Sequence, residues 1–234
     1  MSAIIKRELS AYFNSAIGYI VLAVFYFFSG LFFYMYCLLS NTASMTYVFL
    51  SMLMIVMLLV PIITMKSFSE ERKQKTDQAL LTAPVSLTEI VLGKFLGAFL
   101  LYCICNAIYI LYAVILAFYA SPDWAVLMTT LLGMLLMGGA LIAIDLFISA
   151  LTESQVIAAV ISIGVGLLIY MLDSLSNLIS AEWFTHFLNN ISFDAHFTNF
   201  INGILNLTSI LFFLSVTAVF LFLCVRVFEK RRWS

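Results

Sequence analysis

The longest stretch without a charged residue runs from Leu9 to Met65 and is 57 residues long. A water-soluble domain cannot cover so much apolar surface, and the exposed remainder would aggregate. The chain is 64% hydrophobic and 10% charged, so its solvent is largely lipid. A spanning helix needs about 20 apolar residues, so this stretch holds two spans. Four further stretches hold one each, which predicts an all-α membrane protein with six transmembrane helices: Phe95–Pro122, Trp124–Ile144, Ser154–Leu172 and Ala195–Val225.

These spans form a single transmembrane domain over residues 1–234. We expect them at about 17–39, 45–65, 95–119, 125–150, 155–172 and 207–227, with Pro61 kinking the second. Residues 1–14 alternate apolar and charged side chains at helical spacing, which predicts an interfacial helix. Residues 66–94 form the only substantial charged segment, and residues 174–206 form a longer, aromatic-rich segment between the last two spans.

The basic residues predict the orientation in the membrane. All eleven Lys and Arg residues fall in three short stretches, which are Lys6 and Arg7; Lys66, Arg72, Lys73, Lys75 and Lys94; and Arg226, Lys230, Arg231 and Arg232. With six spans, these stretches share one side, and basic residues are retained in the cytoplasm. The opposite side carries only the acids Asp123, Glu182 and Asp194. We therefore place both termini and residues 66–94 in the cytoplasm.

Patterns typical of an enzyme are missing. Gly93-Lys94 has no Gly five residues before it and opens a span, so it is not a phosphate-binding loop. His186 and His196 both lie in the 174–206 segment, where they are more typical of loop or interface residues than of metal ligands. The few basic residues lie too close to the membrane for a nucleic-acid footprint. The sequence therefore predicts neither catalysis, nor a cofactor or metal in this chain, nor nucleic-acid binding.

Inside the spans, Asp145 and two glycines are the candidate functional residues. An acid inside a membrane span is a functional candidate. Asp145 lies 20 residues after Ala125, about 30 Å along a helix and near the inner boundary, so an interfacial structural role and a gating role both remain open. Gly138 and Gly139 permit close helix packing and are also candidate gating points in a moving helix.

Residues 66–94 predict two helices separated by a break. Residues 68–81 carry charges of both signs and can form one helix, which Pro84 ends. Ser86 then begins a second helix, with Glu89 completing a capping box. This helix pair is the only sizeable cytoplasmic feature, so we expect it to dock a partner.

At this segment the chain resembles the permease subunits of ABC-2-type transporters, in particular the short six-span kind similar to gliding-motility-associated and copper-processing permeases. The matching residues here are Glu70, Glu71, Arg72, Lys73, Thr76, Leu80, Leu81, Pro84, Gly93 and Lys94. Lys75 and Gln78 stand where the family pattern has Gly and Glu. The resemblance extends to Lys6-Arg7-Glu8-Leu9 with Tyr12-Phe13-Asn14-Ser15, to Ser149–Gln155, and to Phe193-Asp194-Ala195-His196-Phe197.

The resemblance implies a half-transporter in a bacterial cell membrane. Two permease chains, identical or different, would pair above two separate ABC ATPase subunits that bind ATP and Mg. Residues 66–94 would carry ATPase motion into the spans, through Glu70, Glu71, Arg72, Lys73, Thr76, Leu80, Leu81 and Pro84. The 174–206 segment would form short outer helices that shield the exit. A simple belt of aromatic side chains at the membrane surface is the alternative for that segment.

The predicted function is therefore the transmembrane subunit of an ATP-driven exporter. A membrane anchor or sensor that recruits a cytoplasmic protein without transport is the alternative, and an ATP-independent carrier is a third hypothesis. Apolar and aromatic spans with few polar side chains favour an amphiphilic substrate such as a lipid, peptide or drug.

Overall fold

The computed structural model describes residues 2–74, 86–119, 121–176 and 190–232, and within these ranges the chain is helical and has no strand. The helices are α1 (Ser2–Phe13), α2 (Ala16–Phe33), the π-helix η1 (Tyr34–Leu38) that continues α2, α3 (Thr46–Thr64), α4 (Ser69–Lys73), α6 (Leu87–Asn106), α7 (Ile108–Tyr119), α8 (Trp124–Leu151), α9 (Gln155–Ser176), α11 (Phe193–Ile201) and α12 (Leu207–Arg232). The all-α prediction is confirmed.

The predicted spans correspond to these helices. In the described residues, five helical stretches are long and apolar enough to cross a membrane, and α9 is a shorter apolar helix. Most helix ends agree with the predictions within a few residues, as in α8, expected at 125–150. The exceptions are α6, which begins at Leu87 and not at the expected 95, and α12, which continues to Arg232 past the expected 227. Helix α8 begins after Asp123 because the Asp123 carboxylate accepts hydrogen bonds from the amides of Ala125 and Val126, at 3.0 and 3.2 Å.

The third span differs from a simple helix in two ways. Its helix α6 begins at Leu87, where the Ser86 hydroxyl accepts a hydrogen bond from the Glu89 amide at 3.2 Å. The second helix of the charged segment is therefore continuous with the span, as the predicted cap implies. The helix is then interrupted at Ala107, between α6 and α7. No proline or glycine stands at this position, so the sequence did not predict the interruption.

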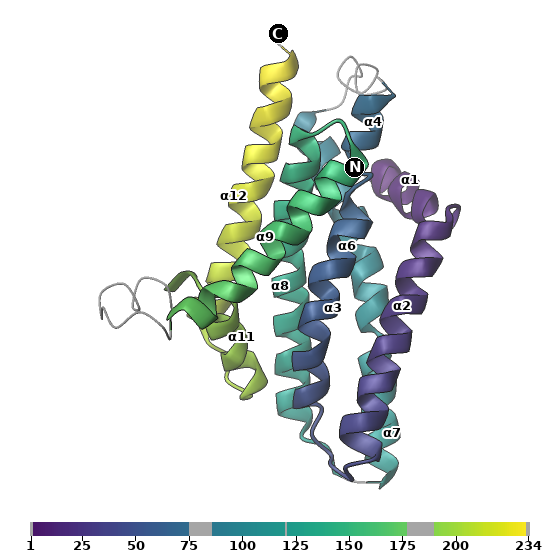
Figure 1. The fold of residues 1–234 in the computed structure, drawn as a ribbon, viewed down its shortest axis with the longest axis vertical. Helices are drawn as coiled ribbons and strands as arrows, with labels where there is room; N and C mark the ends of the chain where they lie inside the picture. Colours follow the sequence, from purple (N-terminus) through teal and green to yellow (C-terminus); the bar gives the residue numbers. More distant parts are fainter. Residues whose placement is uncertain (1, 75–85, 120, 177–189, 233–234) are drawn as a thin grey trace.

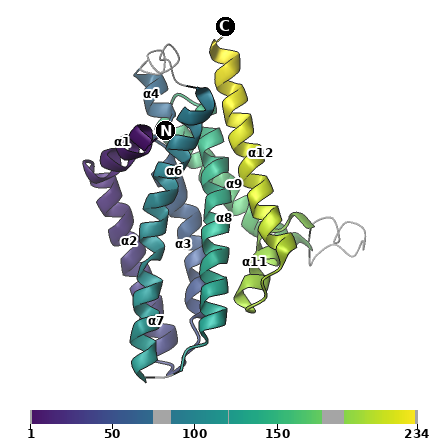
Figure 2. The same cartoon turned by 180° about the vertical axis from the view of Figure 1, so that it is seen from behind.

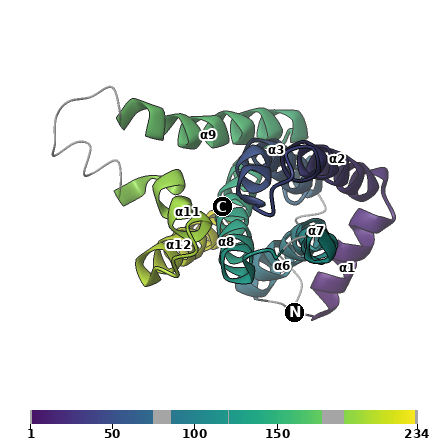
Figure 3. The same ribbon diagram turned by 90° about the horizontal axis from the view of Figure 1, so that it is seen from below.

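Helices α2, α3, α6–α7 and α8 run side by side along the long axis of the molecule (Figures 1 and 2). Helix α12 packs along α8, while α9 crosses α3 and α8 at a slant and extends away from the bundle (Figure 3). Helix α1 lies across the end where α4 and the C-terminus are also found. We call this the basic end, because Lys6, Arg7, Lys66, Arg72 and Arg231 lie on its helices and turns. The three basic stretches therefore share one end, as the charge pattern predicts.

Helix α8 forms the centre of the bundle and contacts α3, α6, α9, α11 and α12. Two of its glycines allow neighbours to approach closely. A Cβ atom at Gly138 would lie 2.2 Å from the Tyr102 ring, and one at Gly133 would lie 2.7 Å from Phe200. The Tyr102 hydroxyl also donates a hydrogen bond to the Met134 carbonyl at 3.0 Å, so α6 and α8 are fixed to each other by packing and by a polar contact.

Helix α11 is the described part of the predicted outer helices. Its apolar face is buried against the bundle and consists of Phe193, Phe197, Phe200 and Ile201. Two threonines of α8, Thr129 and Thr130, donate hydrogen bonds to the Phe200 carbonyl at 3.0 and 3.2 Å. An aromatic belt would instead turn these rings toward lipid. This part of the segment is therefore a packed helix; Trp183, Phe187 and His186 lie outside the described residues.

The two neighbouring glycines of α8 make a matched test of packing. We expect Gly138→Ala to lower the free energy of unfolding by about 1–3 kcal/mol, because the added methyl group overlaps the buried Tyr102 ring. Gly139→Ala is the control, since its nearest neighbour is the Phe99 ring at 3.4 Å, an ordinary contact. Unfolding of both variants in detergent micelles measures the difference, and equal stabilities would show that the packing at Gly138 is not decisive.

Candidate functional site

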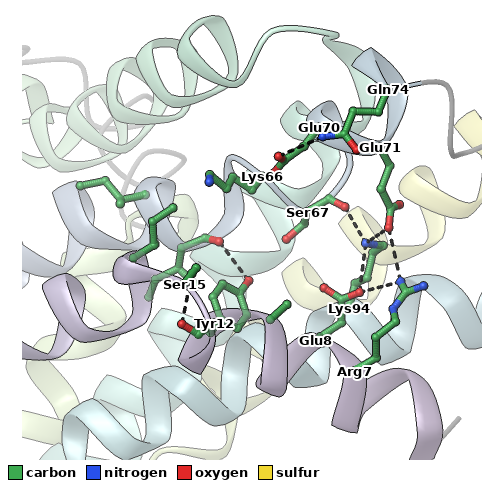
Figure 4. A pocket seen from close by; sticks show the side chains of 14 residues that line it. Arg7, Glu8, Tyr12, Ser15, Lys66, Ser67, Glu70, Glu71, Gln74 and Lys94 are labelled. Carbon is green, nitrogen blue, oxygen red and sulfur yellow. Dashed lines mark hydrogen bonds and ion pairs between the residues drawn. The ribbon is translucent and has the colours of Figure 1, made fainter.

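A single lysine organises the basic end of the bundle. Lys94 lies two turns into α6, and its side chain is only 2% exposed. Its ammonium group donates three hydrogen bonds, to the Glu8 carboxylate at 3.2 Å, to the Glu71 carboxylate at 2.8 Å and to the Ser67 carbonyl at 2.6 Å. The ring of Phe68 covers the ammonium at 5.1 Å from its centroid. Lys94 therefore joins α1, the α3–α4 turn and α4 to the third span (Figure 4).

The charges around Lys94 balance. Arg7 contacts the same oxygens as Lys94, at 2.8 Å from Glu8 and 3.3 Å from Glu71, so two cations face two carboxylates. The hydrogen bond from Arg7 to Glu8 raises the pKa of the guanidinium, which therefore stays charged. Arg7 is half exposed and water screens its pairs, whereas the Lys94 pairs are buried and cannot be replaced by water. The stability of the cluster therefore depends mainly on Lys94.

Two glycines of α6 let α1 approach closely enough for these contacts. A Cβ atom at Gly93 would lie 2.6 Å from Ile4, and one at Gly97 would lie 2.7 Å from the Cβ of Glu8. Farther along α1, the Tyr12 hydroxyl donates a hydrogen bond to the Ile63 carbonyl of α3 at 3.0 Å. Burial raises the pKa of Tyr12, which keeps this donor protonated. Helix α1 is thus docked on α6 and α3, and its place at the membrane interface stays a prediction.

Helix α4 is also held from its opposite side, by the turn between α8 and α9. Arg72 donates a hydrogen bond to the Leu151 carbonyl at 2.8 Å and pairs with the Glu153 carboxylate at 2.8 Å. The Ser149 hydroxyl accepts hydrogen bonds from the amides of Phe68 and Ser69, at 3.3 and 3.2 Å, which are free because α4 begins there. Helix α4 therefore connects two parts of the bundle, α1–α6 through Glu71 and α8–α9 through Arg72.

The coupling residues predicted from the sequence differ in their surroundings, and some of them lie outside the described residues. Glu71 and Arg72 are engaged within the chain, while Glu70 accepts a hydrogen bond from Gln74 at 3.3 Å and Lys73 is exposed. Thr76, Leu80, Leu81 and Pro84 lie outside the described residues, as do Lys75 and Gln78, so the predicted helix over residues 68–81 is described only as α4. Docking of a partner on these residues stays a prediction.

The candidate gating residues lie deeper in α8. Asp145 is 4% exposed, and its carboxyl group interacts with the Ser162 hydroxyl of α9. This contact connects α8 to α9; the structural and gating interpretations of Asp145 both stay predictions. Gly138 faces the Tyr102 ring, and the nearest side chain to Gly139 is Phe99, so both glycines have packing roles whether or not they gate.

Sequence reasoning assigned no role to Lys94 or Glu8 beyond their places in the family pattern. One signal was available: a lysine two turns inside an apolar helix needs a partner, because an unpaired ammonium is costly there. The identity of that partner was not available, because Glu8 and Lys94 are 86 residues apart.

Lys94, Arg7, Glu8, Ser67 and Glu71 form what we call the Lys94 cluster. A pocket of about 470 Å³ is lined in part by this cluster and lies between α1, the start of α2, the end of α3, and α4 (Figure 4). Its floor includes the apolar side chains Ile17 and Ile62, and its polar wall includes Lys66 and Glu70. Among the described residues, no group of three or more His, Cys, Asp or Glu side chains is placed to hold a metal ion.

A comparison with protein families supports a membrane transport role. The family model described as "ABC-2 family transporter protein" matches residues 3–233, which is nearly the whole chain. No match is found among curated proteins. The matched region includes α1, α4 and α6, and therefore every residue of the Lys94 cluster.

Removal of the Lys94 charge tests the cluster. We expect Lys94→Met to lower the free energy of unfolding by about 3–5 kcal/mol, because it removes the buried cation and leaves the partly buried Glu8 and Glu71 carboxylates to the half-exposed Arg7, whose pairs water screens. Lys73→Met is the control, since Lys73 is exposed on α4. Unfolding in detergent micelles measures both variants.

A triple variant separates the lost charge from lost packing. If the uncompensated carboxylates cause the loss, Glu8→Gln and Glu71→Gln added to Lys94→Met should recover part of it. A Lys94→Met protein as stable as the Lys73→Met protein would contradict the assigned role.

Proposed function

The chain belongs to the ABC-2 family of transporter membrane proteins, and on that premise we propose that residues 66–94 are the segment through which it couples to its ATPase. As a permease of this family, it is the membrane component of an ABC transporter and associates with an ABC ATPase subunit. Family members lack ATPase activity, so ATP is hydrolysed on the partner.

The connections of α4 on two sides carry this proposal. A push on α4 from the ATPase reaches α1 and α6 through Glu71 and Lys94. The same push reaches the α8–α9 turn through Arg72, Leu151 and Glu153. A rigid element that contacts both groups of helices can change their relative positions, which is what alternation between two states of a pathway requires.

Within α4 we propose a division of roles. Lys73 contacts the ATPase, since its side chain is exposed at the end of the molecule where α4 lies. Glu71 and Arg72 transmit the motion, since their charges are used inside the chain. Thr76, Leu80, Leu81 and Pro84 complete the docking surface, in keeping with the family pattern.

We extend the proposal to the assembly. Two permease chains pair, identical or different, in a bacterial cell membrane, with both termini and residues 66–94 in the cytoplasm. The supporting observation is that the basic stretches gather at one end of the bundle. The motif pattern supports a place among the short six-span exporters similar to gliding-motility-associated permeases. The whole chain acts as one permease domain. Its interfacial, coupling and outer segments are residues 1–14, 66–94 and 174–206, in that order. Helix α8 contributes the candidate gating residues Asp145, Gly138 and Gly139.

Two neighbouring substitutions in α4 separate docking from transmission. We expect Lys73→Glu to weaken co-purification with the partner ATPase by about tenfold, because it reverses a charge at the proposed contact. We expect Arg72→Ala to leave the ATPase bound but to remove stimulation of its activity by the transported substrate, because α4 loses its connection to the α8–α9 turn. Pull-down and ATPase assays on the reconstituted complex measure the two effects.

Lys230→Glu is the matched control, since Lys230 is an exposed lysine near the C-terminal end of α12. It should change neither measurement. Unchanged binding by Lys73→Glu would contradict the docking role. A complex that binds the ATPase and exports nothing in any condition would favour the non-transporting anchor instead.

A further inference from the structure

The pocket at the Lys94 cluster contains two charges that have no oppositely charged partner among the described residues. Among the described residues, no group is within ion-pair or hydrogen-bond distance of the Lys66 ammonium. The Glu70 carboxylate accepts one hydrogen bond, from the neutral Gln74 side chain, which leaves its charge uncompensated. Lys66 and Glu70 line the same pocket, and no ion pair joins them (Figure 4).

The other charges that the described residues bring to this pocket cancel. Arg7 and Lys94 are paired with Glu8 and Glu71, two cations with two anions. The pocket therefore presents one net cation and one net anion on its wall. A zwitterion, with a negative and a positive group a few bonds apart, complements this arrangement better than a free anion, which Glu70 would repel.

The pocket lies at the level where phospholipid headgroups are found. Helix α3 has 19 residues between Thr46 and Thr64, so it rises about 28 Å and crosses a hydrocarbon core of about 30 Å. Lys66 is the first charged residue after it. Ile17, the second residue of α2, and Ile62 line the deeper side of the pocket and can contact the beginning of an acyl chain.

We propose that this pocket binds a phospholipid that carries a primary ammonium group, of the phosphatidylethanolamine class. The Lys66 ammonium pairs with the lipid phosphate. The lipid ammonium donates hydrogen bonds to the Glu70 carboxylate, which a quaternary choline group cannot do. A phosphatidylglycerol headgroup has no cation for Glu70. The bound lipid fills the space between α1 and α4, at the junction that connects the interfacial helix to the coupling segment.

The composition of the retained lipid tests the proposal. The full-length chain is reconstituted in nanodiscs of equal amounts of phosphatidylethanolamine, phosphatidylcholine and phosphatidylglycerol, re-extracted in mild detergent and analysed by native mass spectrometry. We expect retention of phosphatidylethanolamine about tenfold above either other lipid, the effect of one charge-assisted hydrogen bond. Equal retention of the three lipids, or a bound mass of inorganic phosphate alone, would overturn the proposal.

Single substitutions test which residue binds the phosphate of the headgroup and which binds its ammonium group. Lys66→Met should lower retention of every lipid, and Lys66→Arg should restore it. Glu70→Gln should keep phospholipid bound but remove the preference for phosphatidylethanolamine over phosphatidylcholine. Lys73→Met is the control, because it removes a lysine from the exposed side of α4 and should retain lipid as the unsubstituted chain does. If Lys66→Met also retains lipid unchanged, Lys66 does not bind the phosphate and the proposal is wrong.

Discussion

The buried ammonium of Lys94 is the interaction on which the arrangement of the basic end depends. An ammonium group 2% exposed inside an apolar helix is tolerated only when its three protons all find acceptors. These acceptors come from three different places in the chain, residues 8, 67 and 71. The positions of α1 and α4 relative to α6 are therefore fixed by one requirement, that Lys94 be fully paired. Small residues at Gly93 and Gly97 meet the geometric part of this requirement, because they bring Glu8 within reach.

The same requirement explains how a five-residue helix can transmit force. Helix α4 is too short to be stable by itself, since isolated helices need roughly 12–15 residues. It is ordered because contacts hold it on both sides, Lys94 on Glu71 and the α8–α9 turn on Arg72. Helix α4 can stay ordered only while both groups of helices remain in contact with it. If those groups move apart, one set of contacts must break, so α4 is suited to linking an event below the membrane to the spans above it.

Sequence patterns predicted the elements of this fold better than their contacts. The apolar helices follow from local composition, which lipid imposes on every residue of a span, so most of their limits are readable within a few residues. The start of α6 at Ser86 was readable because a cap is also local. The interruption at Ala107 was not, since neither proline nor glycine marks it. The role of Glu8 was not readable either. Its partner is 86 residues away, and the helical pattern of residues 1–14 does not identify that partner.

The basic residues that set the orientation during membrane insertion also form ion pairs in the folded chain. During insertion the basic residues act as single charges, because acids contribute little to orientation at that stage. In the folded chain, four of these residues, Arg7, Arg72, Lys94 and Arg226, are paired with carboxylates and no longer act as free charges. The first three each pair with a carboxylate on another helix or turn. Pairing can form only after α1, α4 and α6 have reached the same side of the membrane. A chain inserted in the opposite orientation at one span would separate Lys94 from Glu8 and lose the buried ion pair between them, which penalises that topology again at the folding step. The Lys94 cluster therefore makes the correct orientation a condition of stability as well as of insertion.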